Sequence, residues 1–155
     1  MVYGKLVADE ERINEVNEIL NEVFFEELKF KNDDDIFDIS GNKVYHALLY
    51  EGLKEEKAVA AGRLIIRNGN AYIKWIAVRK NYRNRQYGDM IARMLIDKAR
   101  SLLIEEIFVD VPANLAGMFK KIGFKSYYEE KNSNLAPNYI IMKYNNGQLN
   151  CCKNK

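Results

Sequence analysis

The sequence predicts one α/β domain in which a central β-sheet is flanked by helices. Strand-length apolar segments recur along the chain, and they are separated by segments whose apolar residues have helical spacing. A chain of 155 residues with 48% hydrophobic residues is also large enough to bury one core. We expect the domain to span residues 1–145, with residues 146–155 as a polar, disordered tail.

The N-terminal part is predicted to hold a strand, a helix and a variable loop. Residues 4–8 form the strand, and Asp9 is placed to cap a helix. The apolar positions of this helix recur every three or four residues: Ile13, Val16, Leu20, Val23 and Phe24. Residues 26–39 are expected to form a second short helix and a loop, in which Asp33, Asp34 and Asp35 mark a polar break.

The remaining elements follow in mixed order. Residues 44–50, 58–66 and 72–78 are predicted strands, the last two joined as a hairpin by a turn at Asn68, Gly69 and Asn70. A long helix at 87–103 and a short one at 115–121 enclose a buried strand at 107–111. Final strands are expected at 125–128 and 139–144.

The junction between the strand at 72–78 and the long helix predicts an anion site. The connecting turn delivers Arg79, Lys80, Arg83 and Arg85 to the start of the helix. A helix N-terminus exposes about four unbonded N–H groups and carries about half a positive charge. This arrangement suits a phosphorylated ligand, and we expect a pyrophosphate group there.

At this turn the chain resembles the GCN5-related N-acetyltransferases, whose signature is (Arg or Gln)-x-x-Gly-x-(Gly or Ala). Arg83 and Gly88 match its first and last positions, and Gln86 stands in place of the middle glycine. A second family motif resembles the segment from Asn114 to the pair Gly123 and Phe124. The resemblance covers nearly the whole chain and is nearest to small bacterial members of unassigned substrate.

The resemblance implies a fold and a cosubstrate. The fold is a mixed, mostly antiparallel sheet of six to seven strands with about four helices and a splay between the fourth and fifth strands. The cosubstrate is acetyl-coenzyme A, with no metal. The implied cofactor-binding residues are the strand backbone at Ile76, Ala77 and Val78, the turn and first helical residues Arg83, Asn84, Arg85, Gln86, Tyr87, Gly88 and Asp89, and also Asn114 and Phe119.

Two of these residues carry further expectations. Asn114 is placed to cap the helix at 115–121, and in the family the matching residue also reaches the pantetheine arm. Phe119 stands where many family members place a tyrosine that acts as an acid. A thiol with a pKa of about 8.5 can leave as thiolate, so water could serve instead, or a phenol from Tyr127, Tyr128 or Tyr139.

The base is left open among several residues. Glu26 and Glu27 lie where the fold usually covers the acceptor, Asp110 lies near the splay, and His46 is the sole histidine. A water molecule relayed to a backbone carbonyl is a further alternative. We take Glu26, Glu27 and Tyr128 as the catalytic candidates, whereas Arg63 on the hairpin is expected to be a surface charge.

The implied function is transfer of an acetyl group to a primary amine of a small molecule or peptide, by direct attack in a ternary complex. The alternatives are a catalytically decayed coenzyme A-binding regulatory module, and an interaction module that uses the basic stretch 79–85. The acidic residues of segment 24–44 are compatible with a cationic amine or polyamine, but a solvated loop is the explanation we favour. A homodimer is also compatible with the sequence.

Charge and composition exclude other classes. The chain has 24 basic and 22 acidic residues, a balance that argues against a dedicated nucleic-acid binder. No apolar run approaches the length of about 20 residues that spans a bilayer, so we expect no membrane contact and a cytoplasmic location. Cys151 and Cys152 are adjacent in the polar tail, which favours neither a disulfide framework nor a metal site.

Overall fold

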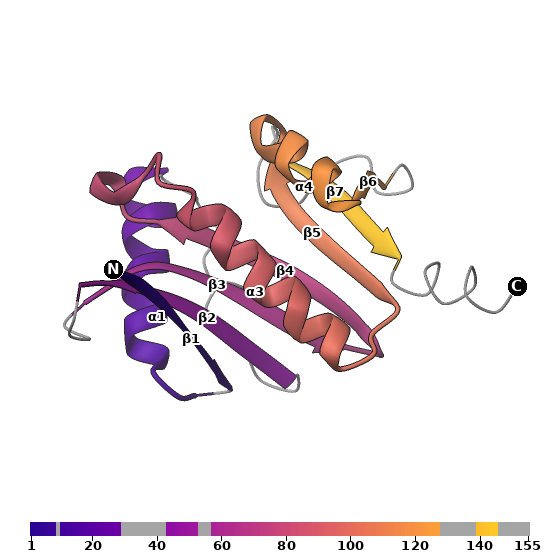
Figure 1. Cartoon of the computed structure of the whole chain (residues 1–155), viewed down its shortest axis with the longest axis horizontal. Helices are drawn as coiled ribbons and strands as arrows, with labels where there is room; N and C mark the ends of the chain where they lie inside the picture. Colours follow the sequence, from indigo (N-terminus) through magenta and orange to yellow (C-terminus); the bar gives the residue numbers. More distant parts are fainter. Residues whose placement is uncertain (9, 29–42, 53–56, 128–138, 146–155) are drawn as a thin grey trace, which may run out of the picture.

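The computed structural model describes residues 1–8, 10–28, 43–52, 57–127 and 139–145. The expected loop after residue 28, the candidate Tyr128 and the tail at 146–155 lie outside these residues. The described part contains a seven-stranded sheet in the order β1-β2-β3-β4-β5-β7-β6 (Figure 1). Its strands are β1 (Val2–Ala8), β2 (Lys43–Glu51), β3 (Ala58–Arg67), β4 (Asn70–Val78), β5 (Glu106–Pro112), β6 (Lys125–Ser126) and β7 (Tyr139–Asn145).

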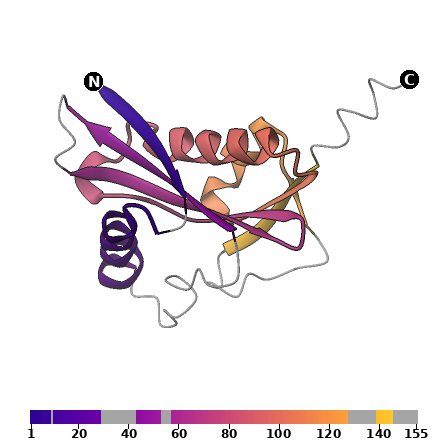
Figure 2. The same cartoon turned by 90° about the horizontal axis from the view of Figure 1, so that it is seen from below.

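Three α-helices of the described chain pack on this sheet: α1 (Ile13–Leu20), α3 (Tyr87–Ser101) and α4 (Ala116–Ile122). Helix α1 continues into a π-helical segment, η1 (Asn21–Glu27). Figure 2 shows α1 on one face of the sheet and α3 on the other. Tyr87, Ile91, Leu95 and Ala99 are buried at four-residue spacing on α3, as the sequence pattern predicts. The predicted fold class is confirmed, with one α-helix fewer than expected.

Two predicted helix caps are wrong. Helix α1 begins only at Ile13 and its N-cap is Arg12 in the left-handed conformation, because a backbone turn from Glu10 O to Ile13 N precedes it. Asp9, the expected cap, lies outside the described residues. Helix α4 has Leu115 at its N-cap, because Asn114 belongs to the short 3-10 turn η3 (Ala113–Leu115) that precedes the helix.

Other boundaries also differ from the sequence prediction. Glu26 and Glu27 end the π-helical segment η1, which continues α1, whereas the sequence pattern predicts that a second short helix begins at residue 26. The strand expected at 125–128 covers only Lys125–Ser126 in the described part. Gly123 ends α4 with a φ of 123°, and a Cβ there would meet the ring of Tyr144 at 3.0 Å.

A β-bulge interrupts the pairing of β3 with β4. Ala61 pairs with Ala77 and Arg63 pairs with Lys74, so Trp75 and Ile76 both lie opposite the single residue between them. Trp75 adopts a left-handed φ of 62°. Because the bulge shifts the alternation by one residue, the indole of Trp75 packs in the core on the α1 face, while Ile76 packs toward α3.

The predicted splay between the fourth and fifth strands is present. Strand β4 pairs with β5 in parallel register only from Ala71 to Ile73. Beyond Val109, the described residues of β5 pair with β7 alone. The backbone of β4 from Lys74 to Val78 therefore faces a gap on the β5 side, and the candidate site lies there.

None of the helices in the described ranges is long and apolar enough to cross a membrane.

Candidate active site

A cleft of about 830 Å³ opens where β4 and β5 separate. Its walls come from the last residues of β4, the turn and first residues of α3, the end of β5, helix α4 and η1. The cleft brings together eleven residues singled out from the sequence: Glu27, Ile76, Ala77, Val78, Arg83, Asn84, Gln86, Tyr87, Gly88, Asp89 and Phe119.

Two other predicted site residues, Glu26 and Arg85, lie outside the cleft lining. Glu26 lines a separate surface hollow beside Lys57. Arg85 donates a hydrogen bond to the carboxylate of Glu51 at 2.7 Å. Asn114 lies on η3 next to Leu115, which does line the cleft. Tyr128 lies outside the described residues.

The start of α3 supplies the anion-binding part of the cleft. The first hydrogen bond within the helix is donated by Met90 N–H to Gln86 O at 3.1 Å, so the preceding N–H groups have no partner inside the helix. Asn84 and Gln86 both adopt left-handed φ values, of 65° and 64°, which curve the turn that leads into these N–H groups. The residues present therefore fit a pyrophosphate group held by backbone N–H groups.

Gly88 faces the splay from the first turn of α3. A Cβ at this position would lie 3.9 Å from Val78 Cγ2 and 4.0 Å from Ile76 Cγ2. The glycine therefore leaves open the space between the helix start and the free edge of β4. A thin pantetheine arm running along β4 fits this space.

Gln86 occupies the backbone conformation that glycine adopts at low cost. A left-handed φ costs a residue with a Cβ about 1 kcal/mol, and part of this cost is offset because glycine is more flexible when unfolded. We expect Gln86→Gly to change the free energy of unfolding by less than about 1 kcal/mol and the Kd for acetyl-coenzyme A by less than about tenfold. Urea titration and calorimetry check both values, and a larger change in Kd would show that the side chain itself takes part in binding.

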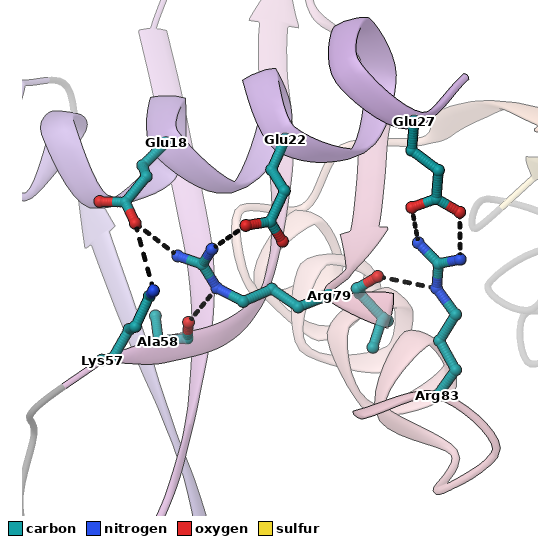
Figure 3. A network of polar contacts seen from close by, with 8 residues as sticks. Glu18, Glu22, Glu27, Lys57, Ala58, Arg79 and Arg83 are labelled. Carbon is teal, nitrogen blue, oxygen red and sulfur yellow. Dashed lines mark hydrogen bonds and ion pairs between the residues drawn. The ribbon is translucent and has the colours of Figure 1, made fainter. Parts of the chain in front are cut away.

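The basic turn is engaged by carboxylates of the same chain (Figure 3). Arg79 binds Glu18 and Glu22 on the α1–η1 segment, Arg83 binds Glu27, and Arg85 binds Glu51. The sequence pattern predicts that these arginines bind a phosphate group together. Their side-chain contacts with carboxylates do not support that prediction. The positive charge of the turn is largely compensated, which leaves the backbone N–H groups of α3 as the main anion donors and disfavours the interaction-module alternative.

Arg83 joins the turn to η1 at the mouth of the cleft. Its Nη1 and Nη2 bind the two carboxylate oxygens of Glu27, the latter at 2.6 Å, and its Nε donates to Val78 O at 2.9 Å. Hydrogen bonding from Arg83 lowers the pKa of Glu27, with burial opposing the shift. A carboxylate held in this way is a weak base, so the geometry favours an anchoring role for Glu27 over proton abstraction.

The Arg83–Glu27 pair should make a small, pH-dependent contribution to stability. Because the pKa of Glu27 is lowered in the folded chain, the contribution is fully present above the unfolded pKa of about 4.3 and is lost as pH falls through the folded value. Since both side chains are partly exposed, we expect Glu27→Gln to cost about 0.5–1 kcal/mol at neutral pH. Urea titrations should show this difference shrinking toward zero below pH 4, and a constant difference would contradict the assignment.

The opposite end of the cleft is formed by Asp110, Tyr139 and Trp75. Burial, followed by the charge of Asp110, raises the pKa of Tyr139 to about 12, so its phenol keeps its proton at neutral pH. Of the tyrosines considered as acids, Tyr139 lines the cleft, whereas Tyr127 packs edge-on against Phe108 outside it.

Three further side chains have defined positions. Phe119 is fully buried against Phe124, with ring centroids 5.4 Å apart, and adds an apolar ring to the cleft lining. His46 is fully buried in the sheet away from the cleft lining. Arg63 is buried and not at the surface as predicted; it donates to Asn17 Oδ1 at 3.3 Å, and burial lowers its pKa to about 10.

Comparison with known proteins agrees with this geometry. The family model described as "Acetyltransferase (GNAT) family" matches residues 13–124. A Bacillus subtilis (strain 168) protein, named the uncharacterized N-acetyltransferase YjcF, is 24% identical over 126 residues, which cover 81% of this chain and 87% of that protein.

Among solved structures, Escherichia coli ElaA is similar with a TM-score of 0.76 and 15% identity, over 93% of this chain and 99% of that one. The PaiA N-acetyltransferase of Thermoplasma acidophilum, solved in complex with coenzyme A, gives a TM-score of 0.65 and 11% identity, over 94% and 99%. Since the family model spans most of the chain, this protein belongs to the GNAT family of acetyltransferases.

Proposed function

We propose that this chain transfers an acetyl group from acetyl-coenzyme A to a primary amine of a small molecule or peptide, by direct attack in a ternary complex. The observation that carries the proposal is the continuity of a single cleft. It runs from the N–H groups at the start of α3, along the free edge of β4, to the carboxylate of Asp110. The two ends suit a phosphorylated cosubstrate and a cationic acceptor, respectively.

The backbone does most of the binding in this proposal. The N–H groups at the start of α3 hold the pyrophosphate, and Gly88 leaves room for the pantetheine arm. In the β4 segment from Ile76 to Val78, the backbone N–H groups that point away from β3 have no partner in β5 in the described structure, and they can donate to negative charge developing on the carbonyl oxygen. Acetyl-coenzyme A supplies an activated thioester, and the cleft holds the amine beside it.

The cleft also limits the choice of proton-transfer groups. For proton removal we favour Asp110, acting directly or through water, over the candidates Glu26 and Glu27. Glu27 is held by Arg83, and Glu26 lies outside the cleft lining. Tyr139 remains protonated and can donate a hydrogen bond near the reacting groups, although its high pKa makes it a weak acid.

Two measurements test the proposal. Acetyl-coenzyme A should raise the melting temperature in a saturable manner, because a ligand that binds only the native state stabilises it. Thiol release should then depend on an added amine from a panel of polyamines, aminoglycosides, amino acids, amino sugars and peptides. Saturable binding without thiol release from any amine would favour the decayed regulatory module. No thermal shift at millimolar cosubstrate would overturn the proposal.

A further inference from the structure

The acceptor end of the cleft has an aromatic wall. Phe24 of η1, Trp75 at the bulge of β4 and Tyr139 at the start of β7 all line the cleft and are all buried. Phe24 and Trp75 pack edge-to-face with ring centroids 5.1 Å apart. Leu28 adds an aliphatic side chain to the same lining. This surface suits an apolar or aromatic group better than it suits an extended polyamine.

Trp75 also brings an unused hydrogen-bond donor to this wall. Its side chain is 4% exposed, and its Nε1–H has no hydrogen-bond partner among the residues that the structure describes. Buried indole N–H groups normally have a partner, so this donor is suited to an acceptor atom that arrives with a ligand. The left-handed backbone at the bulge holds the indole on the acceptor face, even though such a conformation is costly for a bulky residue.

A carboxylate lies on the same face of the cleft. Asp110 follows the last β5 residue that pairs with β4. It pairs with Ile141 of β7, and Tyr139 lies two residues away on the same face of that strand, opposite Pro112. Asp110 and Tyr139 both line the cleft, and the charge of Asp110 adds to the effect of burial in raising the pKa of Tyr139. Two further acidic residues line the cleft, and they form ion pairs: Glu27 with Arg83, and Asp89 with Arg93.

Taking the proposed acetyl transfer as its basis, we propose that the acceptor is an α-amino amide with an aromatic or branched apolar side chain. Its ammonium is drawn to Asp110, its side chain packs on the wall formed by Phe24 and Trp75, and its carbonyl oxygen accepts a hydrogen bond from Trp75 Nε1–H. During transfer the ammonium loses one proton through Asp110 to solvent, and the neutral amine attacks the thioester carbonyl to form the new N–C bond. The C–S bond then breaks with the electron pair leaving on sulfur, and the second proton of the nitrogen passes to that sulfur directly or through solvent. A free amino-acid amide and a peptide N-terminus share this chemistry.

Four matched amines test the proposal by thiol release: phenylalaninamide, phenethylamine without the carboxamide, glycinamide without the aromatic ring, and the tripeptide phenylalanyl-glycyl-glycinamide. We expect kcat/KM for phenylalaninamide to exceed that for glycinamide by at least about tenfold, because burial of a large apolar side chain contributes that much or more. The tripeptide distinguishes a peptide N-terminus from a free amino-acid amide as the acceptor. A kcat/KM for the tripeptide well above that for phenylalaninamide indicates a peptide N-terminus, and a kcat/KM well below it indicates a free amide.

The variant Trp75→Phe removes the indole N–H and keeps an aromatic ring. The ratio of kcat/KM for phenylalaninamide to that for phenethylamine should fall by about five- to tenfold in this variant, since only the first amine has the carbonyl oxygen. A purely structural role would lower both values together and leave the ratio unchanged. Acetyl-coenzyme A binding, measured by thermal shift, shows that the variant is folded.

A second readout needs no variant, because Trp75 is the sole tryptophan of the chain. Phenylalaninamide added to the protein with coenzyme A should change the tryptophan emission saturably, and at lower concentration than phenethylamine does. The proposal is overturned if glycinamide or spermidine is the better acceptor, or if the emission does not respond to phenylalaninamide. Failure of every amine to release thiol would count instead against the proposed acetyl transfer.

Discussion

Replacing Arg79 with methionine should lower the free energy of unfolding by about 3 kcal/mol. The Arg79 side chain is only 8% exposed and links three segments that are distant in the sequence. Its Nε donates to Ala58 O at 2.8 Å, Nη1 to Glu22 at 2.6 Å and Nη2 to Glu18 at 3.0 Å. Methionine keeps most of the apolar stem but leaves the buried carbonyl of Ala58 without this donor, and it removes the cation between the two carboxylates (Figure 3).

The matched control for this variant is Lys57→Met. Lys57 pairs with the same Glu18 at 3.8 Å, but its side chain is 65% exposed. An exposed pair contributes little, so we expect a change below about 0.5 kcal/mol. Urea unfolding of both variants at neutral pH measures the difference. Equal and small effects would mean that Arg79 does not anchor the α1–η1 segment to the sheet.

Elements with a strong local signal were predictable from the sequence. Helix α3 has buried residues every four positions, and the hairpin of β3 and β4 has a glycine-containing turn. The splay and the positions of Ile76, Ala77 and Val78 followed from the family resemblance, because the motif at Arg83 and Gly88 fixes where β4 ends. The described structure confirms the splay and places these residues in the cleft.

Long-range partners were not predictable in the same way. Arg79 and its carboxylate partners are separated by 57 and 61 residues, and Arg83 and Glu27 by 56. A run of basic residues before a helix looks the same in the sequence whether it faces phosphate or carboxylates of its own chain. The arginines that were expected to bind an anion at this turn instead form ion pairs within the chain, and the backbone N–H groups at the start of α3 are the proposed anion donors.

The position of Trp75 in the cleft was also not predictable, for a different reason. The family resemblance points only to the backbone of the three residues that follow it. Strand alternation would place residues 73, 75 and 77 on one face, and only the bulge opposite Gly62 moves the indole to the acceptor side. No local pattern in the sequence of β4 predicts that bulge. A single tryptophan near the end of a predicted active-site strand is nevertheless a residue worth testing.

Replacing Gly88 with valine should weaken acetyl-coenzyme A binding by at least tenfold, about 1.4 kcal/mol, with little effect on folding. A Cβ at Gly88 has ordinary van der Waals distances to Val78 and Ile76, so the folded chain can accept it. The added methyl groups would nevertheless fill the space between the start of α3 and the free edge of β4, where the pantetheine arm is expected. Calorimetry gives the Kd, and urea titration shows whether the free energy of unfolding stays within about 0.5 kcal/mol.

Two control variants make this result specific. Met90→Val introduces the same branched side chain two residues later on α3, at a position that is 36% exposed and outside the cleft lining, so it should bind acetyl-coenzyme A as the wild type does. Arg83→Ala should raise the Kd less than Gly88→Val, because the Arg83 guanidinium is held by Glu27 and Val78 O. If Arg83→Ala proved the more damaging change, the side chains of the turn, and not its backbone, would be the main ligands of the pyrophosphate. If Gly88→Val bound as tightly as Met90→Val, the cosubstrate could not pass between α3 and β4, and the assignment of the cleft would have to be abandoned.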